Sequence, residues 1–109
     1  MTIDFLSTEY KAIEHFNGGE GVFFAKIVDD GLNKILSGML EPGSTIGMHT
    51  HSVNSEIIFI TEGEGTVKTP NGDEPVKAGQ CSYCKKGEAH SLCNTGSTTL
   101  KFYAVVPMQ

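Results

Sequence analysis

The sequence contains no arginine: its eight basic residues are all lysines, and with 13 acidic residues the formal net charge is -5. A planar guanidinium group can hold a phosphate or a carboxylate at two points, whereas a lysine offers a single point charge. We therefore expect any small anion to be held by lysines or by a bound metal ion. The negative net charge also argues against nucleic acid or an anionic membrane as a partner.

Long apolar runs are missing as well. No segment approaches the roughly 20 residues that span a membrane, and the chain does not start with the charged-then-apolar pattern of a signal peptide. The cysteines are an odd number, Cys81, Cys84 and Cys93, and none is needed to explain folding. We therefore expect a protein of the reducing cytoplasm, with no membrane partner.

The sequence is rich in glycine and has short segments typical of β-strands. A chain of 109 residues with 13 glycines and 39% hydrophobic residues favours one all-β domain over a helical bundle. The expected domain spans residues 1–109. Strands are predicted at residues 22–28, 34–40, 57–60, 81–83, 89–94 and 99–106.

Three further local signals complete this outline. The dipeptide Asn71-Gly72 is typical of a hairpin turn, and Pro70 and Pro75 beside it indicate strand ends or a sheet edge. A short helix is predicted around residues 8–14.

Four residues carry the strongest chemical signal: His49, His51, Glu56 and His90. Two histidines one residue apart on a strand point to the same face. The polar turn at residues 52–55 allows Glu56 to begin a return strand beside them, which predicts three ligands on the inner wall of one hairpin. Imidazoles suit Zn, Cu, Fe and Ni, and a carboxylate also accommodates Mn.

The same residues resemble the conserved motifs of the cupin superfamily. The first motif is matched by Gly43, His49, His51, Glu56 and Gly63, and the second by Gly79, Gly87, His90 and Asn94. Lys85 departs from the pattern, because the family usually has proline there. The resemblance covers roughly residues 35–106, and two linked motifs at this spacing are a specific signal.

The resemblance implies a cupin-type double-stranded β-helix, a jelly-roll barrel with a short N-terminal extension. It implies that His49, His51, Glu56 and His90 hold one divalent metal, with Mn or Fe favoured over Ni, Zn and Cu. Several cupin enzymes that act on phosphorylated or nucleotide-linked sugars use charged clamps. A sugar-phosphate isomerase is therefore disfavoured in a chain without arginine.

Strand parity predicts the lining of the pocket. If His51, Glu56 and His90 point inward, alternate residues on their strands share the inner face. On the last strand Phe102 and Ala104 are favoured inside, since the other choice would turn Lys101 inward. The predicted substrate pocket, an apolar cavity with a metal at its floor, is lined by Ile58, Ile60, Tyr83, Leu92 and Phe102.

The same residues allow other interpretations. The four ligands could be hydrogen-bonded barrel residues without a metal, and Cys81, Cys84, His90 and Cys93 could form a zinc knuckle. The zinc knuckle is disfavoured because its spacing is uncommon and His90 and Cys93 would face opposite sides. We expect ordinary buried cysteines, although a redox-sensitive pair at Cys81 and Cys84 stays open. His15 is expected at the surface or an interface, and Met48 in packing.

Three functions remain as hypotheses. The first is a metal-dependent enzyme, of oxygenase, decarboxylase, isomerase or lyase type, in which Glu56 doubles as a proton acceptor. Its substrate would be a small oxygen-bearing molecule chelated by the metal. The second is a metal-dependent binding or sensing module without catalysis, and the third is a structural barrel. A homodimer is expected, formed through the N-terminal segment and exposed edge strands.

Overall fold

The structure is a computed structural model that describes residues 1–109, and it consists almost entirely of strands. Two short 3-10 helices, η1 (Phe5–Ser7) and η2 (Phe16–Gly18), lie near the start of the chain. The strands are β1 (Lys11–Glu14), β2 (Val22–Asp29), β3 (Asn33–Leu40), β4 (His49–Thr50), β5 (Glu56–Glu62), β6 (Glu64–Thr69), β7 (Gly72–Lys77), β8 (Cys81–Cys84), β9 (Ala89–Cys93) and β10 (Leu100–Pro107). None of the helices has the length and apolar character needed to cross a membrane.

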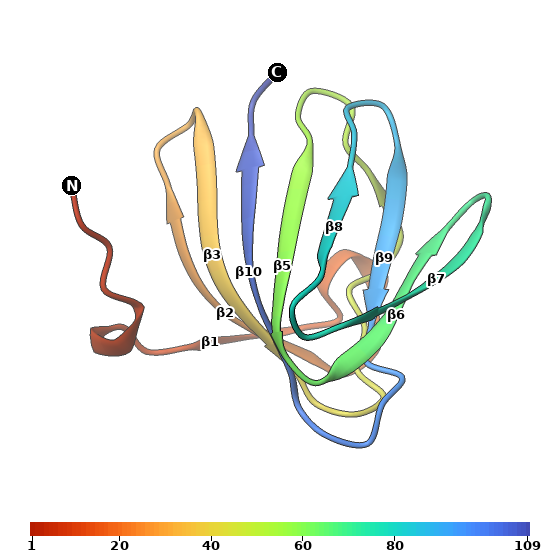
Figure 1. The fold of residues 1–109 in the computed structure, drawn as a ribbon. Coiled ribbons are helices and arrows are strands. Elements are labelled where there is room, and N and C mark those ends of the chain that lie inside the picture. Colours follow the sequence, from red (N-terminus) through yellow and green to blue (C-terminus); the bar gives the residue numbers. More distant parts are fainter.

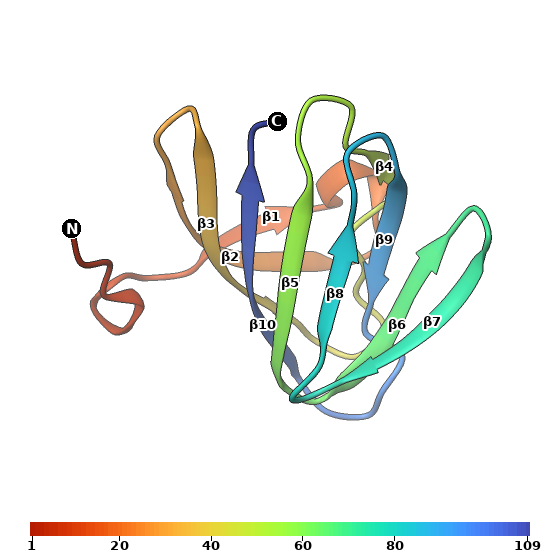
Figure 2. The ribbon, with the colours of Figure 1, turned by 45° about the horizontal axis from the view of Figure 1, so that its top comes forward.

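The strands form two antiparallel sheets. The larger has the order β1-β2-β3-β10-β5-β8 and the smaller the order β4-β9-β6-β7 (Figure 1, Figure 2). From β4 onward the chain passes repeatedly from one sheet to the other, and only the β6–β7 hairpin keeps two consecutive strands in the same sheet. This arrangement is the jelly-roll barrel, or double-stranded β-helix, that the motifs predicted.

Most predicted strands are confirmed, and the N-terminal helix is wrong. Residues 11–14 form β1, which pairs with β2 through four residues in antiparallel register. The exposed edge of β2 supplies hydrogen-bond partners that the local helical preference could not offer, so sheet pairing prevails. The hairpin turn is shifted by one residue, because Thr69 pairs with Gly72 and the turn is Pro70-Asn71. Pro75 lies on β7, which is an edge strand as expected.

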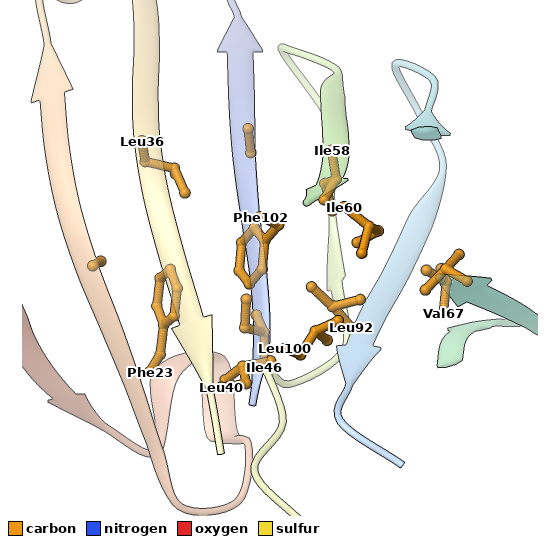
Figure 3. Close-up of a cluster of buried hydrophobic side chains, with 13 residues drawn as sticks. Phe23, Leu36, Leu40, Ile46, Ile58, Ile60, Val67, Leu92, Leu100 and Phe102 are labelled. Atoms are coloured by element: carbon orange, nitrogen blue, oxygen red, sulfur yellow. The ribbon is translucent and has the colours of Figure 1, made fainter. Parts of the chain in front are cut away.

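The barrel is filled by apolar side chains from both sheets (Figure 3). Phe102 and Ala104 on β10 are buried while Tyr103 between them is 45% exposed, which confirms the predicted parity of that strand. Phe102 stacks on Phe23 at a centroid distance of 6.0 Å. It also lies over Gly38, where even a methyl group would collide with its ring. Burial of an aromatic side chain of this kind stabilises the fold by roughly 1.5–3 kcal/mol.

Candidate metal centre

The four predicted ligands come from three strands and converge at one end of the barrel. His49 begins β4, His51 follows that strand by one residue, Glu56 begins β5 and His90 lies on β9. Their potential ligand atoms all lie within 4.8 Å of one another, and His51, Glu56 and His90 are buried. The protein contains no other cluster of this kind.

The route by which the ligands meet differs from the expected hairpin. β4 and β5 belong to different sheets, and β4 pairs with β9, so that His49 lies directly opposite His90. Residues 52–55 carry the chain from one sheet to the other rather than folding it back on itself. The site is therefore built across the barrel, and the expectation of three ligands on one hairpin is wrong.

Carboxylate oxygen Oε1 of Glu56 is the centre of the cluster. It lies 2.8 Å from Nε2 of His90, 3.3 Å from Nε2 of His51 and 3.8 Å from Nε2 of His49. The Nε2 atoms of His51 and His90 are 3.0 Å apart. The three imidazole rings meet edge-on, with centroids 4.7 to 4.9 Å apart.

Hydrogen bonds on the far side of two rings fix which nitrogen faces the centre. Nδ1 of His49 lies 2.8 Å from the carbonyl oxygen of Gly47, and Nδ1 of His51 lies 2.6 Å from Oδ1 of Asn54. Both partners accept, so each Nδ1 carries the proton and donates it. The Nε2 atom of each ring is then left with its lone pair toward the cluster, as in a metal-ligating histidine.

A divalent cation fits this donor set. Ligands that bind one ion at about 2.1 Å and at right angles lie about 3.0 Å apart, close to the separations of His90 from His51 and from Glu56. Without a metal, Nε2 of His90 can donate a proton to Oε1 of Glu56 at 2.8 Å; a divalent cation among the same atoms would take the place of that proton and accept the lone pairs of all four ligands. Buried His90 Nδ1 has no hydrogen-bond partner in the protein, so hydrogen bonding does not fully explain the placement of this ring.

The same contacts perturb two pKa values. Burial alone would raise the pKa of Glu56, but the three imidazoles around it together hold that pKa far below its usual range. The pKa of His51 is raised, chiefly by its contact with Glu56. The charge of Lys34 opposes this rise, which places the lysine within electrostatic reach of the site.

A cavity of about 280 Å³ opens onto three of the ligands, His49, His51 and Glu56. Half of its lining is apolar, and these side chains include Phe23, Ile27, Leu36 and Phe102. Its polar lining comes from the ligands themselves and from Asn17, Lys34, Thr50 and Asn54. The cavity thus combines apolar walls with a few polar groups, as small-ligand sites do.

The predicted pocket residues are divided between the cavity and other places. Phe102 lines the cavity. Ile58, Ile60 and Leu92 are at most 3% exposed and lie in the core cluster, outside the cavity lining. Tyr83 is 55% exposed on the outer face of β8, because its neighbour Cys84 takes the inward position. Tyr83 lines a second cavity, to which His90 and Cys84 also contribute, and not the cavity that contains His49, His51 and Glu56.

The remaining candidates are not part of the ligand cluster. Cys81 is exposed and Cys84 and Cys93 are buried, and all three are free thiols, so burial was wrongly expected for Cys81. Burial, with the charges of nearby Glu88 and Glu56, raises the pKa of Cys84 to about 11. His15 is exposed and bonds the carbonyl oxygen of Gly19. Met48 is 48% exposed, so the expectation that it packs is wrong.

Sequence reasoning missed several residues of the cavity. Phe16 and Asn17 reach it because the backbone of residues 16–20 is hydrogen-bonded to residues 45–47. Asn54 was predicted only as part of a turn, and its position three residues after His51 was the available signal. Lys34 shares its strand face with Leu36, but nothing in the sequence showed which face of that strand looks inward.

Comparison with known proteins assigns the chain to a family. Residues 37–106 match the family described as Cupin domain, which is more than half of the chain. The chain therefore belongs to the cupin family. Together with the cluster of three histidines and one glutamate, this defines a metal-binding cupin.

Both comparisons find similarity to Thermotoga maritima. A protein named oxalate-binding protein is 45% identical over 67 residues, which are 62% of this chain and 55% of that protein, so the chain spans about half the length of this relative. A crystal structure described as a predicted oxalate decarboxylase superposes with a TM-score of 0.93 at 30% identity, covering 100% of both chains. A polyketide cyclase from Streptomyces resistomycificus shares the fold, with a TM-score of 0.79 at 22% identity over 100% of this chain and 81% of that one.

Proposed function

We propose that this protein binds a compact dicarboxylate of the oxalate class through a divalent metal held by His49, His51, Glu56 and His90, with Mn or Fe as the metal. The observation that carries the proposal is the convergence of these four donors, three of which, His49, His51 and Glu56, line a small, half-apolar cavity. The similarity to the Thermotoga maritima oxalate-binding protein and to the structure described as a predicted oxalate decarboxylase supports the choice of ligand.

The donor count explains why a chelating ligand suits the site. Four protein ligands on a six-coordinate ion leave two positions, and two oxygens of one small molecule fill both. A metal bound here would supply Lewis acidity toward those oxygens. The chain's own residues orient the imidazole rings through Gly47 and Asn54 and exclude water with the apolar walls.

The test is calorimetric titration of Mn(II)-loaded protein with oxalate, malonate, succinate and acetate. Oxalate is expected to bind tightest, since its two carboxylates can chelate one ion in a five-membered ring. His49→Ala protein prepared in parallel is expected to show neither metal nor oxalate binding. Equal binding of acetate and oxalate by the wild type would contradict the proposal.

Turnover is the second candidate, because Glu56 is a buried carboxylate at the cavity floor. In that case Glu56 accepts a proton, and the reaction falls among the oxygenase, decarboxylase, isomerase and lyase types. Formate and carbon dioxide released from oxalate by the Mn(II)- or Fe(II)-loaded protein would establish decarboxylation. Quantitative recovery of unchanged oxalate after prolonged incubation in air would leave binding as the function.

We also propose that the protein is a homodimer. The outer face of β10, β5 and β8 carries Tyr103, Phe59 and Tyr83, which are 45 to 55% exposed. Tyr103 and Phe59 are cross-strand partners, and Phe5 of the N-terminal segment packs on Tyr103 at a centroid distance of 5.7 Å. An apolar face of this kind suits a second copy of the chain. Light scattering is expected to show a dimer for the wild type and a monomer for Phe59→Glu.

Free thiols support the proposed cytoplasmic location, because the three cysteines form no disulfide and reducing compartments keep thiols in this state. Fractionation of cells that produce the natural protein would test it, with the soluble cytoplasmic fraction as the expected place.

A further inference from the structure

We infer that Lys34 is the residue that selects dicarboxylates over monocarboxylates, by pairing with the carboxylate oxygens that the metal does not hold. The inference rests on the proposed function and names the part of the chain that sets its specificity.

Lys34 stands at the right place for this role. It is the second residue of β3 and lies on the same strand face as Leu36, which points into the barrel. Lys34 and Leu36 both line the cavity that contains His51 and Glu56. None of the other seven lysines lines this cavity. In a chain without arginine, Lys34 is therefore the one lysine or arginine side chain that the cavity offers.

The ammonium group of Lys34 has no partner within the protein. It forms no ion pair within 4.0 Å and no hydrogen bond, although the side chain is half-buried. Its cross-strand neighbour Asp29 uses a carboxylate oxygen to accept from the backbone amide of Gly31. By contrast, Lys101 pairs with Glu62 and Lys26 donates to the backbone of Phe5.

A second donor lies in the same cavity. Oδ1 of Asn54 accepts from His51, and the NH2 group of the same amide forms no hydrogen bond in the protein. Lys34 and Asn54 also both line a neighbouring depression at the cavity rim. Two unpaired donors that line one cavity with His49, His51 and Glu56 are suited to the outward-facing oxygens of a chelated ligand.

The charges explain why the ligand should be a dianion. A divalent ion and the Glu56 carboxylate sum to +1 when the three histidines are neutral. A dicarboxylate brings -2 and leaves the buried site at -1, which Lys34 neutralises. A hydroxy monocarboxylate can also chelate, but it brings -1 and reaches neutrality without the lysine. Burial of an uncompensated charge is costly, so Lys34 discriminates between the two ligand classes.

The experiment compares oxalate with glycolate, which offers one carboxylate and one hydroxyl group. Calorimetry would be performed on Mn(II)-loaded wild type, Lys34→Met, Lys34→Arg and the control Lys68→Met, which removes the same charge from an exposed position on β6. A charged hydrogen bond is typically worth a factor of about 10 to 100 in affinity. We expect Lys34→Met to lose that factor for oxalate and less than about threefold for glycolate.

Metal affinity and thermal stability provide the remaining readouts. Lys34→Met should bind Mn(II) as the wild type does, Lys34→Arg should retain oxalate binding, and Lys68→Met should change neither ligand. Equal loss of oxalate and glycolate, or unchanged oxalate binding in a folded Lys34→Met protein, would overturn the role of Lys34 while leaving the proposed function intact. A wild-type protein that binds Mn(II) but no dicarboxylate would overturn the proposed function itself, and the role of Lys34 with it.

Discussion

His49 and His90 are cross-strand partners: they lie opposite each other in the antiparallel pair of β4 and β9, with ring centroids 4.7 Å apart. Forty residues of chain separate them, yet a single register fixes their distance. Because side chains alternate along a strand, a shift of that register by one residue would turn one ring out of the site. The metal centre thus depends on the pairing of a strand only two residues long.

Loss of a single metal ligand, the His90 imidazole, should abolish stoichiometric metal binding. His90→Ala removes an imidazole that lies 2.8 Å from Glu56 and 3.0 Å from His51. We expect Mn(II) affinity to fall more than about 100-fold, beyond the usual effect of losing an outer partner. His15→Ala is the matched control, since His15 is exposed and outside the cluster. Elemental analysis after dialysis measures the result, and retained metal in His90→Ala would contradict it.

Asn54 should matter for the metal although it is not a ligand. Its Oδ1 receives the Nδ1 proton of His51 at 2.6 Å and so orients that ring. Asn54→Leu is expected to weaken metal binding about 10- to 100-fold, as is usual for such partners. Asn71→Leu, in the exposed turn of the β6–β7 hairpin, should have no effect. Competition with a chelator of known affinity measures both, and equal affinity of the two variants would speak against an orienting role.

Stability should depend on pH in opposite directions with and without metal. In the metal-free protein the pKa of His51 is raised from 6.5, so its stabilisation is present below pH 6.5 and is lost as the pH rises through the raised pKa. The pKa of Glu56 is lowered, so its contribution is present above its ordinary value of 4.5 and is lost as the pH falls. Metal-free protein should therefore be most stable at mildly acidic pH.

With metal bound, stability should instead rise with pH above 6.5. Protons compete with the metal ion for Nε2 of His51, so metal affinity increases until His51 has lost its proton. Melting temperatures of both forms between pH 5 and pH 8 would check this. His51→Gln should flatten the decline of the metal-free form above pH 6.5. Parallel profiles for the two wild-type forms would be inconsistent with the contacts of His51.

The three cysteines should differ sharply in reactivity. Cys81 is exposed, whereas Cys84 is buried with a pKa raised to about 11 and Cys93 is buried. The thiolate is the reactive form, so one thiol per chain should be alkylated at pH 8 in the folded protein and three after unfolding. Mass spectrometry locates the label. Cys81→Ser should leave the folded protein unlabelled, and rapid labelling of Cys84 would contradict its placement.

Gly47 should tolerate no side chain. A methyl group there would collide with the backbone carbonyl group of Asn17, while the carbonyl oxygen of Gly47 holds the ring of His49. Gly47→Ala is expected to lower both stability and metal affinity. Gly79→Ala is a control for general glycine effects: its left-handed backbone adds strain, but the added methyl group would meet open space. Gly79→Ala should therefore lower stability and keep metal affinity. Normal metal affinity in Gly47→Ala would show that the hydrogen bond from His49 to the Gly47 carbonyl oxygen is not needed for metal binding.

The sequence predicted the ligands better than the walls around them. His49, His51, Glu56 and His90 could be found because each has a residue type and a spacing that few other structures require. Tyr83 was predicted in the same pocket as Phe102, but it lines the second cavity beside His90, because Cys84 takes the inward position on β8. Lys34 and Asn17 were missed for a different reason: their approach to the site depends on pairings between distant segments. The hydrophobic pattern of a short segment does not predict which distant segment it pairs with.

The 3-10 helix η2 between β1 and β2 contributes to the choice of ligand as well as to the fold. Phe16 and Asn17 form part of the cavity wall, although they lie outside residues 37–106, the part that matches the family. Substitutions in the first twenty residues can therefore change which small molecule binds while the four metal ligands stay the same. Chimaeras that exchange this leading stretch between cupins would reveal whether ligand choice travels with it.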